Sequence, residues 1–98
     1  MKKIKYSDND WLSCPQCKGD YLHQQTVEYF DRKEDAKTGL HIKLTYGIDS
    51  NTVVDEDQTN NPSERREGLG INFFCEHCEV EYKLCIAQHK GNTHIYWK

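Results

Sequence analysis

The chain has 98 residues and a net charge of −3, with 36% hydrophobic and 30% charged residues. This length indicates a single domain over residues 1–98. The low apolar content excludes a large hydrophobic core and favours added support from a bound metal. The 13 basic and 16 acidic residues are mixed along the chain, unlike the basic stripe that is typical of nucleic-acid-binding proteins.

The sequence also predicts where the protein acts. No apolar run approaches the ~20 residues that span a membrane. The basic N-terminal segment, residues 1–6, lacks the apolar stretch of a signal peptide. We therefore expect a cytoplasmic protein without membrane association. In a reducing cytosol, closely spaced cysteines indicate metal binding rather than disulfides.

The first part of the chain predicts a tight turn and then a strand. The turn is Cys14–Gly19, in which we expect Pro15 to restrict the backbone and Gly19 to adopt a positive φ. Residues 21–30 are rich in aromatic and β-branched types, which favour a strand. The charged segment 31–39 predicts an exposed loop.

The middle of the chain predicts more strands and a long loop. Residues 40–46 alternate strictly between apolar and polar types, which indicates a strand. Its apolar face carries Leu40, Ile42, Leu44 and Tyr46. Residues 52–54 predict a short strand, and 70–74 predict another. Between them, the polar and acidic segment 55–69 predicts a mobile surface loop.

The C-terminal part predicts a β-hairpin. Residues 80–86 alternate in polarity, and Gly91-Asn92 separates them from the aromatic-rich run 93–97. A two-residue connection that begins with glycine suits a type II′ turn. The aromatic side chains that we expect in the core are Phe73, Phe74, Tyr82, Tyr96 and Trp97.

Four cysteines form two Cys-x-x-Cys pairs, and they are the strongest functional signal in the sequence. They are Cys14, Cys17, Cys75 and Cys78. Two such turns supply the four thiolates of a closed tetrahedral site, so we expect one structural Zn²⁺. Redox dithiols and iron–sulfur ligation are the alternatives, although a thioredoxin-type motif requires a βαβ context that these strands do not predict.

The spacing of these pairs resembles the zinc-ribbon family, in which two cysteine knuckles at hairpin tips share one ion. The resemblance covers Cys14–Gly19 and Cys75–Cys78 with the hairpin that follows. The chain departs from the family in the 57 residues between the pairs and in the missing glycine after Cys78. The long interval implies a small β-rich zinc ribbon with antiparallel strands inserted between its knuckles.

The chain is also similar to small zinc-ribbon proteins of bacteria and their phages. The similar segments are the front Cys-Pro-x-Cys, 32–36, 61–69 and 86–91. This resemblance implies the fold, a bacterial or phage origin and the four metal ligands. It implies no catalytic residue.

Several residues outside the cysteine pairs are weaker candidates. Arg65 and Arg66, with Lys90, are candidates for partner binding, because guanidinium groups bind phosphate or carboxylate. Glu64 and Glu67 flank the arginine pair, so a solvated charge cluster is the alternative. For Cys85 we favour a buried thiol over a nucleophile or a replacement ligand.

The histidines predict little function. We expect His89 and His94 to face each other near the hairpin turn, either as a second metal or pH-sensitive site or as two exposed side chains. His23 and His41 are expected on the polar faces of their strands.

These features favour a non-enzymatic zinc-binding protein that acts as a protein-interaction or regulatory module. A nucleic-acid-binding zinc ribbon is the alternative that the family resemblance implies. We expect a protein partner and no small-molecule substrate, because four thiolates leave no coordination position open for one.

Overall fold

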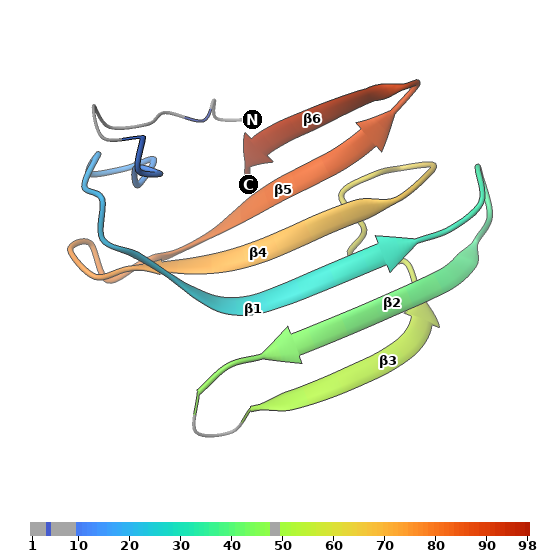
Figure 1. Ribbon diagram of the computed structural model, residues 1–98, viewed down its shortest axis with the longest axis horizontal. Helices are drawn as coiled ribbons and strands as arrows, with labels where there is room; N and C mark the ends of the chain where they lie inside the picture. The colour runs from blue at the N-terminus through green and yellow to red at the C-terminus, as the bar shows by residue number, and fades with distance from the viewer. Residues whose placement is uncertain (1–3, 5–9, 48–49) are drawn as a thin grey trace.

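The structure is a computed structural model of the chain, and it describes residues 4, 10–47 and 50–98. One antiparallel sheet contains the strands in the order β3-β2-β1-β4-β5-β6 (Figure 1). The strands are β1 Leu22–Asp31, β2 Thr38–Thr45, β3 Asn51–Asp57, β4 Gly68–Cys75, β5 Glu81–His89 and β6 Asn92–Trp97. The predicted inserted strands and C-terminal hairpin are therefore present. Within the described residues, no helix is long and apolar enough to cross a membrane.

The sheet consists of two three-stranded meanders that join along β1 and β4. Strands β1, β2 and β3 follow one another, and the chain then returns so that β4 pairs with the free side of β1. This pairing places Leu22, just after the first cysteine turn, opposite Cys75 of the second cysteine pair. The two cysteine pairs consequently lie at the same end of the sheet, on the left in Figure 1.

The two faces of the sheet differ sharply in chemistry. Directly paired residues in an antiparallel sheet project to the same face, so the strand registers assign each side chain to one of two faces. The charged face carries Glu28, His41, Lys43, Asp55 and Lys83. The apolar face carries Val27, Tyr29, Leu40, Ile42, Leu44, Val54, Leu69, Ile71, Leu84, Ile86 and Ile95.

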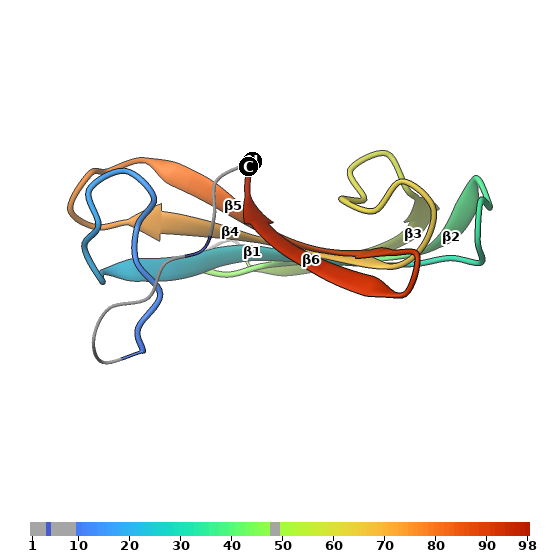
Figure 2. The same ribbon diagram turned by 90° about the horizontal axis from the view of Figure 1, so that it is seen from above.

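The loop between β3 and β4 covers part of the charged face. It stands on one side of the sheet, at the end away from the cysteine turns (Figure 2). The same face carries the buried side chains of Phe30, Cys85 and Ala87. Gly68 permits the close contact, because a Cβ there would lie 2.3 Å from the side-chain oxygen of Asn61.

This loop is shorter than the predicted segment 55–69. Strand β3 continues to Asp57 and β4 begins at Gly68, so only residues 58–67 lie outside the strands. Hydrogen bonds hold the loop in place: the Ser63 hydroxyl donates to the Gln88 carbonyl at 2.7 Å, and Arg32 donates to the Ser63 carbonyl at 2.8 Å. Loop residue Ser63 thus contributes to both contacts, and the mobility of the segment stays a prediction.

Two small clusters replace a single large core. At the loop end, Phe30 is fully buried, and at the cysteine end Trp97 is 2% exposed. Phe73 packs edge-to-face on Trp97, with ring centroids 5.8 Å apart. The prediction of a core position is confirmed for Phe73 and Trp97. Tyr82, Phe74 and Tyr96 are half-buried.

The turn of the terminal hairpin differs from the predicted one. Strand β6 begins at Asn92, which pairs with His89, so the two-residue loop is Lys90-Gly91. Both loop residues have positive φ, 49° for Lys90 and 82° for Gly91. Two positive φ values define a type I′ turn, and the predicted type II′ turn at Gly91-Asn92 was wrong by one residue.

Candidate metal centre

The two cysteine turns have the same backbone hydrogen bonds. In the first turn, Cys14 N–H donates to the Gly19 carbonyl at 2.8 Å, and Lys18 N–H donates to the Cys14 carbonyl at 3.0 Å. In the second turn, Cys75 N–H donates to the Val80 carbonyl at 3.0 Å, and Glu79 N–H donates to the Cys75 carbonyl at 2.8 Å. The chain therefore builds one local conformation twice, 61 positions apart in the sequence.

A non-glycine residue adopts the left-handed conformation in each turn. The positions are equivalent: Lys18 follows Cys17 with φ 67°, and Glu79 follows Cys78 with φ 58°. The prediction that Gly19 supplies the positive φ was wrong. Gly19 instead gives room, because a Cβ there would lie 3.3 Å from the Cys17 sulfur. The missing glycine after Cys78 thus does not prevent the second turn, since Glu79 adopts the required conformation.

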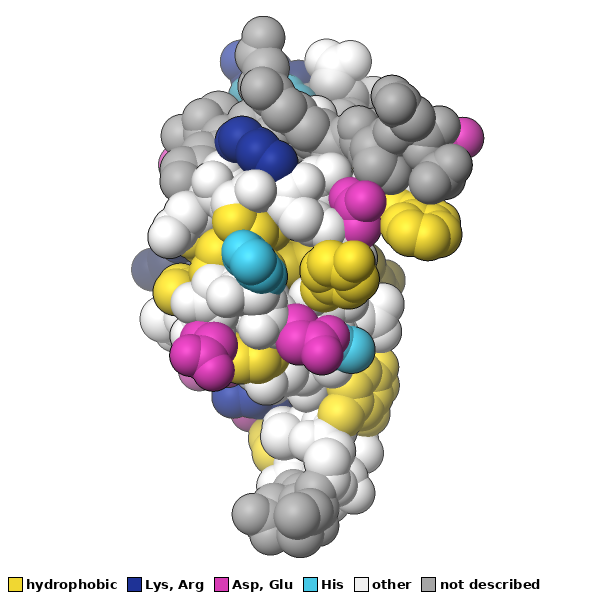
Figure 3. Space-filling view, turned by 90° about the vertical axis from the view of Figure 1, so that its left-hand side faces the viewer, with side chains coloured by type: hydrophobic (Ala, Val, Ile, Leu, Met, Phe, Trp, Pro, Cys, Tyr) yellow, Lys and Arg dark blue, Asp and Glu magenta, His cyan; other side chains and the backbone are white. Residues whose placement is uncertain are grey.

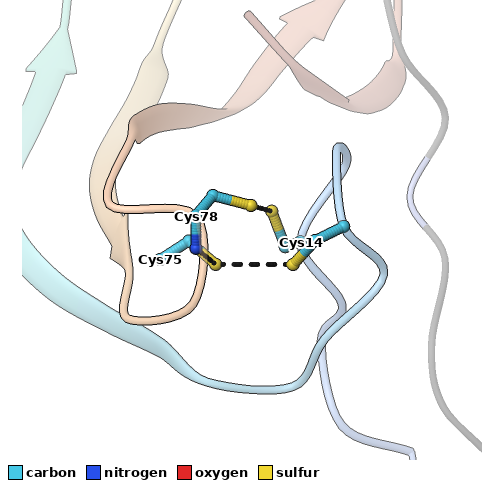
Figure 4. A group of neighbouring side chains, drawn as sticks. Cys14, Cys75 and Cys78 are labelled. Atoms are coloured by element: carbon cyan, nitrogen blue, oxygen red, sulfur yellow. Dashed lines mark hydrogen bonds between the residues drawn. The ribbon is translucent and has the colours of Figure 1, made fainter.

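The four sulfur atoms converge between the two turns. Cys14 projects from the first turn toward Cys75 and Cys78 of the second (Figure 4). The Sγ atoms of Cys14 and Cys78 are 3.7 Å apart, as are those of Cys17 and Cys75. All four lie within 4.8 Å of one another. These separations are far longer than a disulfide bond of ~2.05 Å, so the four thiols are free.

The spacing fits a single metal ion. Zn–S bonds of ~2.3 Å in a regular tetrahedron place the sulfur atoms ~3.8 Å apart. The two shortest sulfur separations, 3.7 Å each, agree with this edge. Four thiolates are the ligand set of zinc and of iron, and all four positions of a tetrahedral ion are then occupied by protein. The four cysteines could therefore hold one metal ion.

Backbone amides and neighbouring thiols tune the ligands. Burial raises the pKa of the Cys14 thiol, but N–H groups of Cys17 and Gln16 and contacts with the Cys75 and Cys78 thiols bring this pKa to about 7. Hydrogen bonding to Cys17, together with desolvation and the charge of Cys14, raises the pKa of Cys78 to about 12. The negative charge of one thiolate therefore disfavours deprotonation of a neighbouring thiol. A bound divalent cation would offset this repulsion.

Polar contacts tie the first turn to the rest of the sheet. The Tyr82 hydroxyl on β5 donates to the side-chain oxygen of Gln16. At the rim, His23 lies 2.9 Å from the Glu76 carboxylate. Acidic, histidine and hydrophobic side chains are interspersed on this end of the molecule (Figure 3), and the described residues there show no continuous basic area.

Cys85 is separate from the cysteine cluster. It lies on the charged face of β5, opposite Gly70 and Tyr96, with an exposed fraction of 1%. Burial raises the pKa of its thiol. A buried, protonated thiol is a poor nucleophile and a poor ligand, which agrees with the predicted structural role.

The arginine pair is engaged within the protein. Arg65 forms two 2.7 Å hydrogen bonds to the Asp35 carboxylate, and Arg66 donates to Glu34 at 2.8 Å. These contacts join the loop to the β1–β2 connection. Both arginines and Lys90 line one pocket of about 350 Å³, together with Glu34. The structure thus brings the three candidate residues together. The guanidinium groups of Arg65 and Arg66 already form hydrogen bonds to carboxylates of this chain.

The prediction that His41 is an ordinary polar-face residue was wrong. His41 is 7% exposed and lies between two carboxylates, 2.9 Å from Glu28 and 2.7 Å from Asp55. Its ring stacks on Phe30 with centroids 4.6 Å apart. Only the strand register brings Glu28, His41 and Asp55 onto one face, so the sequence contained no local signal for this network.

The terminal histidines lie near each other, as predicted. The rings of His89 and His94 have centroids 5.9 Å apart, and both line a shallow pocket of about 220 Å³ with Glu64 and Tyr96. Among the described residues, the four cysteines are the only group of three or more ligand side chains close enough to hold a metal.

No protein-family model, curated protein or solved structure matches this chain. The resemblance to zinc ribbons therefore depends on the four cysteines and the two turns that present them.

Proposed function

We propose that this protein is a non-enzymatic, zinc-stabilised interaction module that contacts a protein partner through the apolar face of its sheet. Zinc is the proposed ion because the sulfur separations fit Zn–S bonds and four cysteines form a typical structural zinc site. Such a site has no position for a substrate, which supports a structural use of the metal.

One observation carries the proposed mode of action: large apolar side chains of the sheet remain in contact with solvent. On the apolar face, Tyr29 is 41% exposed, Leu44 37% and Ile95 48%. Val54, nearer the edge, is 62% exposed. A contiguous exposed apolar patch of this kind marks an interaction site in a soluble protein.

The charge distribution supports a protein partner over nucleic acid. Phosphate backbones are bound by clustered lysine and arginine side chains with free donors. Here Arg65 and Arg66 pair with Asp35 and Glu34, and the net charge is −3. An apolar protein surface is the better complement to the apolar face.

A pair of matched substitutions tests this function. Tyr29→Glu places a charge on the apolar face, and Val53→Glu places the same charge on the opposite face, where Val53 is 40% exposed and pairs with Lys43. Affinity capture from nuclease-treated bacterial lysate should recover a specific protein with the wild type and Val53→Glu, but not with Tyr29→Glu.

The nucleic-acid alternative makes a different prediction. A mobility shift that weakens steeply with salt and is insensitive to Tyr29→Glu would overturn the proposed function. Capture of the same protein by all three variants would show that the apolar face is not the contact surface.

A further inference from the structure

We propose that the apolar face binds a second copy of this chain, so that two sheets pack face to face as a symmetric dimer. This inference rests on the proposed function, because it names the occupant of the same surface. Three features of the described residues carry it: the missing second layer, the charge distribution and the size of the face.

A single sheet with one open apolar face is an incomplete layer. Stable domains bury the apolar side of a sheet against a second layer. In this protein, loop 58–67 lies over the charged face (Figure 2). On the apolar face, no described segment covers β1, β2 and β4 beyond the end that carries the cysteine turns. A second sheet packed at ~10 Å supplies the missing layer in the manner of a β-sandwich.

The charges favour this arrangement between identical copies. At the centre of the apolar face, the side chains are those of Val27, Tyr29, Ile42, Leu44, Leu69 and Ile71. None of them is charged. Of the charged side chains on these strands, Glu28 and Lys43 project to the other face, and Asp31, opposite Leu40, lies at the end of the apolar face. A two-fold contact centred on the six apolar side chains therefore brings no like charges together among them, despite a net charge of −3 per chain. Glu67, which borders the pocket on this face, lies outside this set.

The edge strand β3 disfavours association through that edge of the sheet. Asp55, Glu56 and Asp57 are consecutive and exposed on β3. Charged edge strands resist pairing with another strand, and two copies of this acidic edge repel each other. Association through the β3 edge is therefore disfavoured.

The face is large enough for a specific dimer. Six strands at ~4.8 Å spacing and about six residues at ~3.4 Å per residue give a flat footprint of at most ~29 by ~20 Å, or ~600 Å² per copy. Phe73 and Trp97, on the same face, are already buried within the chain. Two copies therefore bury up to ~1,200 Å², which is the lower bound of stable interfaces. The face is also hollowed: Tyr29, Leu69 and Ile86 border a pocket of about 290 Å³, which can receive a protruding side chain from the partner.

Sedimentation velocity of the metal-loaded full chain over a wide concentration range tests the dimer. The expected mass is twice the 11.6 kDa of one chain. Tyr29→Glu should weaken association roughly a hundredfold or more, because dimerisation would bury an unpaired charge. Val53→Glu should leave it unchanged. Far-UV circular dichroism and metal content establish that both variants are folded.

The outcomes separate this inference from the proposed function. A wild type that is monomeric at every concentration overturns the dimer, and a dimer that Tyr29→Glu leaves intact overturns the assigned face. Neither result affects capture of a different protein through the apolar face. Conversely, a face-dependent dimer that binds nucleic acid through another surface keeps this inference and overturns the proposed function.

Discussion

The imidazole of His41 lies 2.9 Å from the carboxylate of Glu28, and both side chains are less than a tenth exposed. Asp55 takes the other ring nitrogen at 2.7 Å. Both nitrogens therefore face carboxylates, which is the environment of a protonated imidazolium. Lys83 adds a positive charge 3.8 Å from the other Glu28 oxygen. The network joins β1, β2, β3 and β5 across the charged face.

Stability should fall as pH rises through neutrality because of this network. Burial lowers the pKa of His41, but hydrogen bonds to Asp55 and Glu28 outweigh it and raise the pKa above 6.5. The folded state then binds the proton more tightly than the unfolded chain. The stabilisation is fully present below ~6.5 and is lost as pH rises through the folded pKa. Urea unfolding at a series of pH values measures this.

The variant His41→Gln isolates the effect. It keeps a hydrogen-bonding side chain but does not titrate, so the stability difference between wild type and variant should shrink with rising pH. At the acid end, hydrogen bonds from Asp57 N–H and His41 lower the pKa of Asp55, and its contribution is lost as pH falls. A wild type–variant difference that stays constant between pH 6 and 9 would contradict the charged state of His41.

Gly68 and Gly70 should respond very differently to alanine. Both lie on β4, at positions where an added Cβ would project to the charged face. A Cβ at Gly68 would meet Asn61 at 2.3 Å and the Pro62 ring at 2.9 Å, so Gly68→Ala should displace the loop and cost ~1–3 kcal/mol. Chemical denaturation measures the change.

Gly70→Ala is the matched control. A Cβ at residue 70 would lie 2.7 Å from the Cε atom of Lys83. The flexible Lys83 side chain can move aside. We expect a change below ~1 kcal/mol in the free energy of unfolding. Equal losses in the two variants would show that loop packing on Gly68 is not the cause.

Replacing Lys90 with asparagine should stabilise the terminal hairpin. Lys90 and Gly91 both have positive φ, and Asn-Gly is the preferred pair for a type I′ turn. Since lysine in the left-handed region costs ~1–2 kcal/mol and asparagine less, Lys90→Asn should raise the free energy of unfolding by ~0.5–1 kcal/mol. Thermal unfolding measures this change, and a lower melting temperature would contradict the turn assignment.

Removal of one ligand cysteine should release the metal. Structural zinc contributes on the order of 10 kcal/mol in finger peptides, which is comparable to the total stability of a small domain. Cys75→Ala should therefore lose both zinc and cooperative unfolding. Cys85→Ser is the control, because Cys85 lies outside the cluster, and it should retain one ion per chain. Metal content by mass spectrometry and unfolding curves measure both effects.

Local patterns in the sequence predicted most of the strands and the site. Alternation at 40–46 predicted β2, and the Cys-x-x-Cys spacing predicted which side chains converge. These features depend on residues close in the chain. The conformation at Lys18 was not predicted, because the turn imposes a positive φ on whichever residue follows the second cysteine, and residue type alone suggested Gly19.

Features that depend on strand register were not predictable. His41, Glu28 and Asp55 belong to three strands, and only their pairing places them on one face. The same register exposes Leu44, whose alternation with polar residues suggests an inward-facing position. In the part of the chain that the structure describes, no second layer covers the centre of the apolar face, whereas the loop covers part of the charged face. Leu44 therefore stays exposed despite its alternation with polar residues.

Native mass spectrometry of the purified full chain tests the central claim most directly. Four thiolates around one divalent ion predict a single zinc per chain, lost in Cys14→Ser and kept in Cys85→Ser. A native, cooperatively folded wild type that carries no metal ion would contradict the account.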